Sequence, residues 1–125
     1  MDLLNFTENA GVFTDVRAWT DDGNVYALTL QFAQQPLHIF VEQDTDELVV
    51  STSFVLNQQC TQPLTALQDV YGYFLSRTWL MHNHKGYQDA LQLEFYHPDK
   101  SQTHFIQIYV ETSSLKLFRL QQIDV

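Results

Sequence analysis

Residues that build covalent or phosphate-binding sites are scarce in this chain. Of its 125 residues, one is cysteine, four are glycine and six are lysine or arginine. One thiol cannot form an internal disulfide or a metal cluster by itself, and so few glycines argue against a backbone loop that cradles phosphate. Nucleic-acid binding needs clustered lysine and arginine, so the sequence also argues against nucleic acid as a partner.

Long apolar runs are missing as well. No stretch approaches the roughly eighteen apolar residues of a membrane span, and the first residues, MDLLNFTENA, are too acidic and polar for a secretory signal. We therefore expect a cytoplasmic protein with no membrane partner. The formal net charge of −9 has two interpretations, which are simple solubility and electrostatic steering towards a basic protein.

One pattern of residues occurs twice along the chain. The order Arg-x-Trp, Ala-Leu-x-Leu-x-Phe, Ile-x-Val-Glu and Leu runs through residues 17–50 and again through residues 77–120. We interpret this as two copies of one antiparallel β unit, about 1–57 and 62–125, within a single domain. The matched positions are Arg17 with Arg77, Trp19 with Trp79, Ala27 with Ala90, Ile39 with Ile108, Val41 with Val110 and Glu42 with Glu111.

Alternation of apolar and polar residues predicts a mainly β (α+β) fold. The short turns between the expected strands make each group of four an antiparallel meander. Apolar spacings of three, four and seven predict one amphipathic helix at about 63–75, and residues 1–10 suit a short helix or turn. Strands are expected near 12–20, 25–33, 37–42, 48–52, 77–83, 87–96, 103–111 and 115–121.

The two meanders can bury their apolar faces most simply against each other. This predicts a sandwich or a partly open barrel with pseudo-twofold symmetry, and a single eight-stranded sheet with helices on one face is the alternative. Four aromatic residues fall at outward positions of the strands, so either the helix covers them or they form a dimer or partner surface. With an acidic turn added, the candidate partner surface comprises Tyr26, Phe40, Tyr96, Tyr109, Asp44, Asp46 and Glu47.

The segment from Trp79 to Phe95 departs most from its counterpart in the first copy. It is either a hairpin connection whose polar groups bind the turn backbone or a rim pocket with apolar walls and a few polar groups. The ligand-binding residues of such a pocket would be Trp79, Asn83, Tyr87, Asp89 and Glu94. The pattern W-x3-N-x2-G-Y-x-D-A-x-Q-x-E-F in this segment resembles a family of small bacterial proteins of unknown function, and the resemblance implies no activity.

Histidines gather in the second half of the chain, where His82 and His84 would share a strand face and His97 and His104 would flank one loop. Either pair could reach a common metal, but cysteine or acidic ligands at tight spacing are missing, so exposed histidines are the favoured interpretation. No paired carboxylates and no nucleophile elbow are recognisable. We therefore expect no metal, no cofactor and no catalytic residues.

These observations favour a non-catalytic module that binds a protein, plausibly a basic one, and an immunity or antitoxin-like role would be one instance. Two other classes of function stay open. One is a small-ligand-binding or enzymatic domain that uses the rim between Trp79 and Glu94. The other is a homodimeric structural domain that uses the aromatic strand faces.

Overall fold

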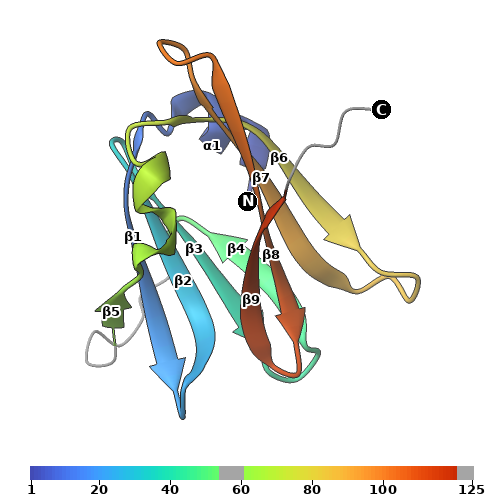
Figure 1. Ribbon diagram of the computed structural model, residues 1–125. Helices are drawn as coiled ribbons and strands as arrows, with labels where there is room; N and C mark the ends of the chain where they lie inside the picture. Colours follow the sequence, from blue (N-terminus) through green and yellow to red (C-terminus); the bar gives the residue numbers. More distant parts are fainter. Residues whose placement is uncertain (54–60, 121–125) are drawn as a thin grey trace.

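The computed structural model describes residues 1–53 and 61–120 (Figure 1). Expected strand positions agree with the observed ones to within a few residues. In chain order the elements are α1 (Leu3–Asn9), β1 (Phe13–Asp21), β2 (Asn24–Phe32), β3 (Pro36–Glu42), β4 (Glu47–Ser51), β5 (Thr61–Pro63), η2 (Thr65–Val70), β6 (Phe74–His82), β7 (Gln88–His97), β8 (Gln102–Glu111) and β9 (Ser114–Leu120).

Within residues 1–53 and 61–120 the strands form two antiparallel sheets and no closed barrel. One sheet has the order β4-β3-β2-β1-β5, and the other has the order β6-β7-β8-β9. Strand β2 lies beside β9, and β4 lies beside β7, so the two sheets face each other along both sides (Figure 1). The predicted mainly β, sandwich-like class is confirmed, and the single eight-stranded sheet is wrong. No helix in residues 1–53 and 61–120 is long and apolar enough to cross a membrane.

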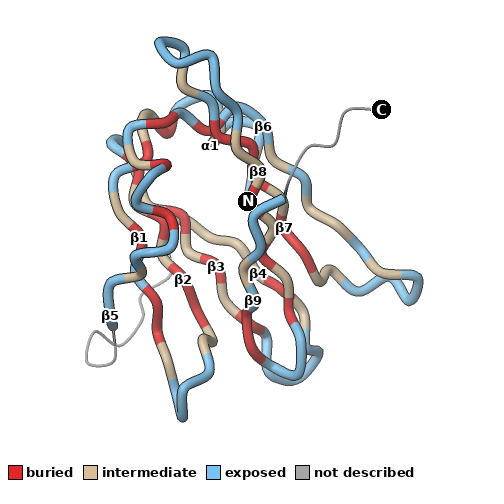
Figure 2. Tube along the Cα trace, in the orientation of Figure 1, coloured by how far each residue is buried: buried red, intermediate tan, exposed pale blue. Residues whose placement is uncertain are grey.

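Strand alternation decides which side chains form the core. In ALTLQF and ALQLEF the residues at every second position are fully buried, for example Leu30 and Leu93 at 0% exposure, because successive side chains of a strand point to opposite faces. Buried residues lie along the strands, and the hairpin ends are exposed (Figure 2). At the centre the ring of Phe13 lies 5.4 Å from that of Phe32 and 5.1 Å from that of Phe95, so one aromatic cluster joins the two sheets.

The hydrogen-bonding registers of the two meanders match. Leu28 pairs with Ile39 as Leu91 pairs with Ile108, which agrees with the repeat expected for β2, β3, β7 and β8. Irregularities after Phe13 and Trp19 in the β1–β2 pair also recur after Leu75 and Met81 in the β6–β7 pair. Since bulges are specific local features of a ladder, their recurrence agrees with the expected pseudo-twofold arrangement.

One part of the proposed repeat is corrected. Trp19 pairs with Ala27, whereas the residue that pairs with Ala90 is Met81, not Trp79. Relative to the hydrogen-bonding register, the Arg-x-Trp motifs of the two copies are therefore displaced by two residues. The two tryptophan side chains lie on the same face of their strands but have different neighbours across the sheet. Trp19 is buried, and Trp79 is 37% exposed.

The helix expected at about 63–75 is shorter than predicted and is not an α-helix. Pro63 is part of the three-residue strand β5, which pairs with β1, so the helical segment η2 begins only at Thr65 and is a 3-10 helix. It ends at Val70, and Gly72 then adopts a positive φ of 91° that turns the chain into β6. Glycine is the residue that takes this conformation at the lowest cost.

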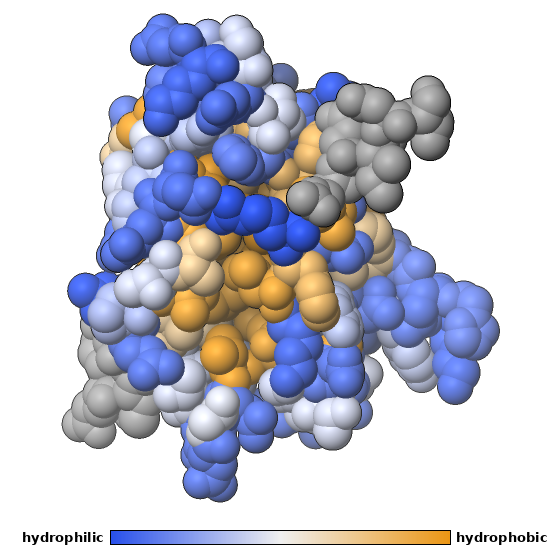
Figure 3. All heavy atoms as spheres, in the orientation of Figure 1, coloured by the Kyte–Doolittle hydropathy of each residue, from blue (hydrophilic) through white to orange (hydrophobic). Residues whose placement is uncertain are grey.

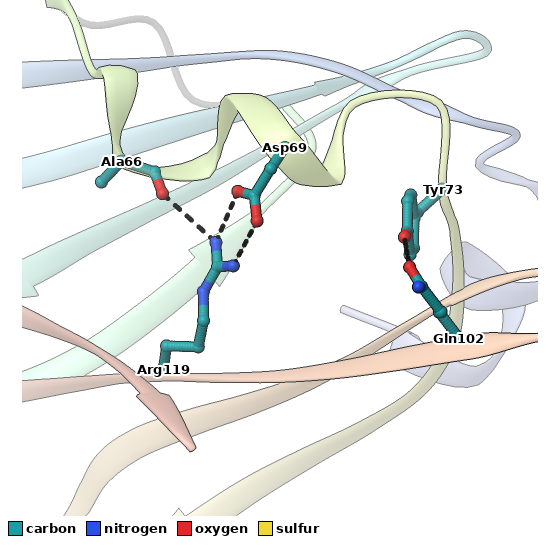
Figure 4. A network of polar contacts seen from close by, with 5 residues as sticks. All are labelled: Ala66, Asp69, Tyr73, Gln102 and Arg119. Atoms are coloured by element: carbon teal, nitrogen blue, oxygen red, sulfur yellow. Dashed lines mark hydrogen bonds and ion pairs between the residues drawn. The ribbon is translucent and has the colours of Figure 1, made fainter. Parts of the chain in front are cut away.

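Each helical segment packs against the first strand of the other meander. Helix α1, whose N-terminus is capped by the Asp2 carboxylate, lies against β6, and η2 lies against β1. Arg119 of β9 reaches across to η2, where its guanidinium binds the Asp69 carboxylate at 2.5 and 2.8 Å and the carbonyl oxygen of Ala66 at 3.2 Å (Figure 4). On this side of the molecule apolar side chains are visible in a hollowed area between hydrophilic rims (Figure 3).

Candidate protein-binding surface

The residues predicted to line a rim pocket are spread along the β6–β7 hairpin. Asn83 organises the hairpin loop, because its side-chain oxygen accepts hydrogen bonds from the backbone N–H groups of Lys85 at 2.9 Å and Tyr87 at 3.2 Å. Asp89 lies at the irregularity in β7, and Glu94 is five residues further along the strand, a separation of about 16 Å. The hairpin interpretation therefore accounts for Asn83, and the ligand-binding role of the set stays a prediction.

Glu94 is nearly buried at 8% exposure. Its carboxylate lies 2.9 Å from Nε of Arg77 on the neighbouring strand, without the alignment of a hydrogen bond. The same guanidinium stands over the ring of Trp79, 5.9 Å from its centre. Arg77 thus links a buried acid to an exposed aromatic ring on the outer face of the second sheet.

The residues predicted to form a partner surface divide between different parts of the molecule. Phe40 lies on the outer face of the first sheet, and Tyr96 and Tyr109 lie on the outer face of the second. Tyr26 lines a polar hollow of about 340 Å³ among the hairpin turns. Asp44 and Asp46 belong to the β3–β4 turn, and Glu47 is the first residue of β4, where it accepts a hydrogen bond from the backbone N–H of Gln88 at 3.0 Å. They are not one continuous set, and their binding role stays a prediction.

Apolar groups gather on the outer face of the β6–β9 sheet. Pairing across the sheet gives two adjacent rows, Trp79–Gln92–Gln107–Phe118 and Arg77–Glu94–Phe105–Leu120. The ring of Phe118 stacks on that of Tyr109 at 5.1 Å, and the ring of Trp79 lies 6.4 Å from that of Phe105. We define the aromatic face as Trp79, Phe105, Tyr109, Phe118 and Leu120.

Several members of the aromatic face are substantially exposed. Trp79 is 37% exposed, Phe118 44% and Leu120 38%. Single apolar residues at the surface are ordinary, but adjacent ones on one face mark an interaction site. Sequence reasoning found Tyr109 but missed Phe105, Phe118 and Leu120. The signal was available, because these three residues occupy the outward positions of alternating strands.

The corresponding face of the first sheet is different. By the matching registers, the positions of Trp79, Phe105 and Phe118 are held there by Arg17, Pro36 and Ser51. A large apolar side chain in the second meander thus replaces a charged, cyclic or small polar residue of the first. At these three positions the aromatic character belongs to the second sheet, whereas the position of Tyr109 is held by Phe40 in the first sheet.

The rings of the aromatic face can attract positively charged groups. Aromatic ring faces attract guanidinium and ammonium groups, and Arg77 over Trp79 shows this contact within the chain. At the β8–β9 end the hydroxyl of Tyr109 donates to the Glu111 carboxylate at 2.6 Å, and this hydrogen bond raises the pKa of Tyr109 above its usual value. An anionic carboxylate therefore stands at the margin of the rings.

Strand β6 has an open side next to this face. In the part of the chain that the structure describes, β6 ends its sheet, and beyond β7 its only partner is Val12, which forms an isolated bridge with Phe74. A mostly apolar hollow of about 280 Å³ lies between α1 and β6, lined by Leu3, Leu4, Thr7 and residues 76–79. Leu4 is 69% exposed at its rim.

The histidines do not assemble a metal centre in the described residues. The rings of His97 and His104 pack on the buried ring of Tyr73 at 5.0 and 5.3 Å, respectively. His38 shares a hydrogen bond of 2.8 Å with Thr29, and burial lowers its pKa. Within residues 1–53 and 61–120, no group of three or more histidine, cysteine or acidic side chains is placed to hold a metal ion.

Comparison with known proteins places almost the whole chain in one family. A family of unknown function, DUF6334, matches residues 7–124, and the chain belongs to it. No curated protein and no solved structure matches the chain. The expected resemblance to an uncharacterised family is confirmed at this level, whereas the motif between Trp79 and Phe95 stays a prediction as a mark of that family.

Proposed function

We propose that this member of the DUF6334 family is a non-catalytic protein-binding domain of the cytoplasm, and that it contacts its partner through the aromatic face. One observation carries the proposal. Exposed apolar side chains gather on the outer face of the β6–β9 sheet. The positions of Trp79, Phe105 and Phe118 are held in the other sheet by Arg17, Pro36 and Ser51. Protein interfaces are enriched in such aromatic groups.

The partner is proposed to be basic. The chain carries a formal net charge of −9, which raises the association rate with a positively charged protein. Exposed rings provide places where arginine and lysine side chains of the partner can stack, as Arg77 does on Trp79. A bacterial immunity or antitoxin-like role is one form that such binding could take.

A capture experiment followed by reconstitution tests the proposal. The immobilised full chain is incubated with native lysate at low and high salt, retained proteins are identified, and the strongest candidate is purified for calorimetry. We expect direct binding by a basic protein, with affinity falling as salt rises because screening weakens the long-range attraction.

Two variants show whether the aromatic face is responsible. Phe118→Glu places a charge among the rings, and Ser51→Glu places the same charge at the corresponding position of the other sheet. Loss of a central aromatic contact costs about 2 kcal/mol, so Phe118→Glu should weaken binding about thirtyfold and Ser51→Glu should change it little. Equal affinity for both variants would remove the aromatic face from the proposal, and salt-independent binding would remove the basic partner.

A further inference from the structure

The two meanders differ at one edge of their first strands, the edge of β1 that points away from β2 and the edge of β6 that points away from β7. In the first meander the residues Arg17, Ala18 and Trp19 of β1 pair with the short antiparallel strand β5. The corresponding residues of β6, by the matching registers, are Trp79, Leu80 and Met81. In residues 1–53 and 61–120 no strand pairs with these three residues on that side.

The backbone of β6 presents donors and acceptors on this open side. In β1 the carbonyl of Val16 accepts a hydrogen bond from the N–H of Leu64 at 3.3 Å, immediately after β5. Thr78 is the residue of β6 that corresponds to Val16. In an antiparallel ladder the backbone N–H and carbonyl groups of every second residue point to the same edge of the strand. Thr78 and Leu80 therefore point their N–H and carbonyl groups away from β7.

The edge of β6 lacks most of the usual protection against pairing, although α1 lies beside it at Thr78. Natural edge strands are usually blunted by proline, lysine or bulges. The register of β6 with β7 is regular from Arg77 to Met81, between its two irregularities, and this stretch contains no proline and one charged residue. It offers five consecutive residues to an added strand.

A side-chain pocket accompanies the open backbone. In the first meander the residue opposite Val16 is Leu64, whose side chain packs against the core. At the corresponding place beside Thr78 lies the hollow of about 280 Å³ between α1 and β6. Its walls include Leu3 and the partly exposed Leu4 and Trp79, so an apolar side chain is the natural occupant.

We propose that an extended segment of the partner protein adds to β6 as an antiparallel strand and places one apolar side chain in the hollow beside α1. Strand addition of this kind combines backbone hydrogen bonds with side-chain pockets. The proposal rests on the proposed protein-binding function and names the form of the ligand. A partner segment is favoured over a second copy of this chain, because each copy carries a net charge of −9 and like charges oppose self-association.

The chain's own β5 region supplies a probe for this edge. We would titrate a synthetic peptide with the sequence of residues 61–66, TQPLTA, into the isotope-labelled full chain and follow backbone amide signals by NMR. The expected result is a saturable shift of the Thr78 and Leu80 amides. The same peptide with Leu64→Glu should bind about tenfold more weakly or worse, because it loses the burial of a leucine side chain.

Variants of the protein locate the binding. Leu80→Pro removes one outward N–H, which edge positions tolerate, and Leu4→Glu charges the rim of the hollow at a residue that is 69% exposed. Each should weaken peptide binding about tenfold. His84→Glu, at an exposed residue of the β6–β7 loop, is the control and should not. The second variant keeps the test valid if the proline prevents folding.

Three outcomes would overturn the inference. They are the absence of a saturable shift at Thr78 and Leu80, shifts confined to the β1 edge at residues 17–19, and a dimer that pairs through β6 without peptide. Failure here is distinct from failure of the proposed function. A partner whose binding is lost in Phe118→Glu but unchanged in Leu80→Pro and Leu4→Glu would leave the aromatic face intact and remove only the added strand.

Discussion

Replacing Phe13 by alanine tests whether the aromatic cluster between the sheets holds the fold together. Phe13 is fully buried, and its ring contacts those of Phe32, Tyr71 and Phe95 at 5.4, 5.2 and 5.1 Å. Removing a buried phenylalanine side chain costs about 3–5 kcal/mol through lost burial and the remaining cavity. With so many ring contacts we expect about 4 kcal/mol, a large share of the roughly 5–15 kcal/mol that stabilise a typical domain.

The assay is urea unfolding followed by near-ultraviolet circular dichroism, with Phe118→Ala as the matched control. Phe118 is the same residue type on an outer sheet face and is 44% exposed, so its replacement should cost about 1 kcal/mol or less. Phe13→Ala should also lower the melting temperature by about 10–20 °C. Equal costs for the two variants would refute the assignment of Phe13 to the core and of Phe118 to an exposed face.

Three further predictions concern single interactions. Arg119 lowers the pKa of Asp69 below its usual value through a two-point hydrogen bond, so the pair stabilises the fold above about pH 4 and this contribution is lost as pH falls through the lowered pKa. The stability difference between wild type and Asp69→Asn should be about 0.5–1 kcal/mol at neutral pH and should vanish in urea titrations at low pH. Gly11→Ala should cost about 1–2 kcal/mol in urea unfolding, because Gly11 has a φ of +80° and a new Cβ would lie 3.1 Å from a neighbouring side chain; a cost below about 0.5 kcal/mol would contradict this. Glu111→Gln should lower the pKa of Tyr109 towards its usual value in an NMR titration of labelled tyrosines, since the carboxylate acceptor of its hydroxyl is what raises it; an unchanged pKa would exclude that hydrogen bond in solution.

The sheet strands of both meanders could be predicted from the sequence to within a few residues. Alternation in segments such as residues 27–32 and 90–95 is strict, and tight-turn residues separate them. The region between the meanders could not be predicted as well. Its apolar spacing suits a helix, but pairing of Pro63 with Arg17 holds the chain extended and leaves only the short η2.

The candidate surface was predicted in part. Tyr96 and Tyr109 were recognised as outward-facing aromatic residues, and they lie on the outer face of the second sheet. Sequence similarity matched Trp19 with Trp79, whereas the hydrogen-bonding register matches Arg17 with Trp79. The sequence match therefore hid the difference between the two outer faces at this position. A register is fixed by pairing between strands, which a single strand does not reveal.

The amino-acid sequence by itself determined which side chains of each strand face inward, where the chain turns, and that the protein is acidic. These properties are local, since a two-residue period and a turn depend only on neighbouring residues. Only the tertiary structure decided that β5 occupies the edge of β1, that no strand of the described residues occupies the corresponding edge at residues 79–81, and that several exposed rings share one face. Those features depend on contacts between segments far apart in the chain, and the pattern of any one segment does not contain them.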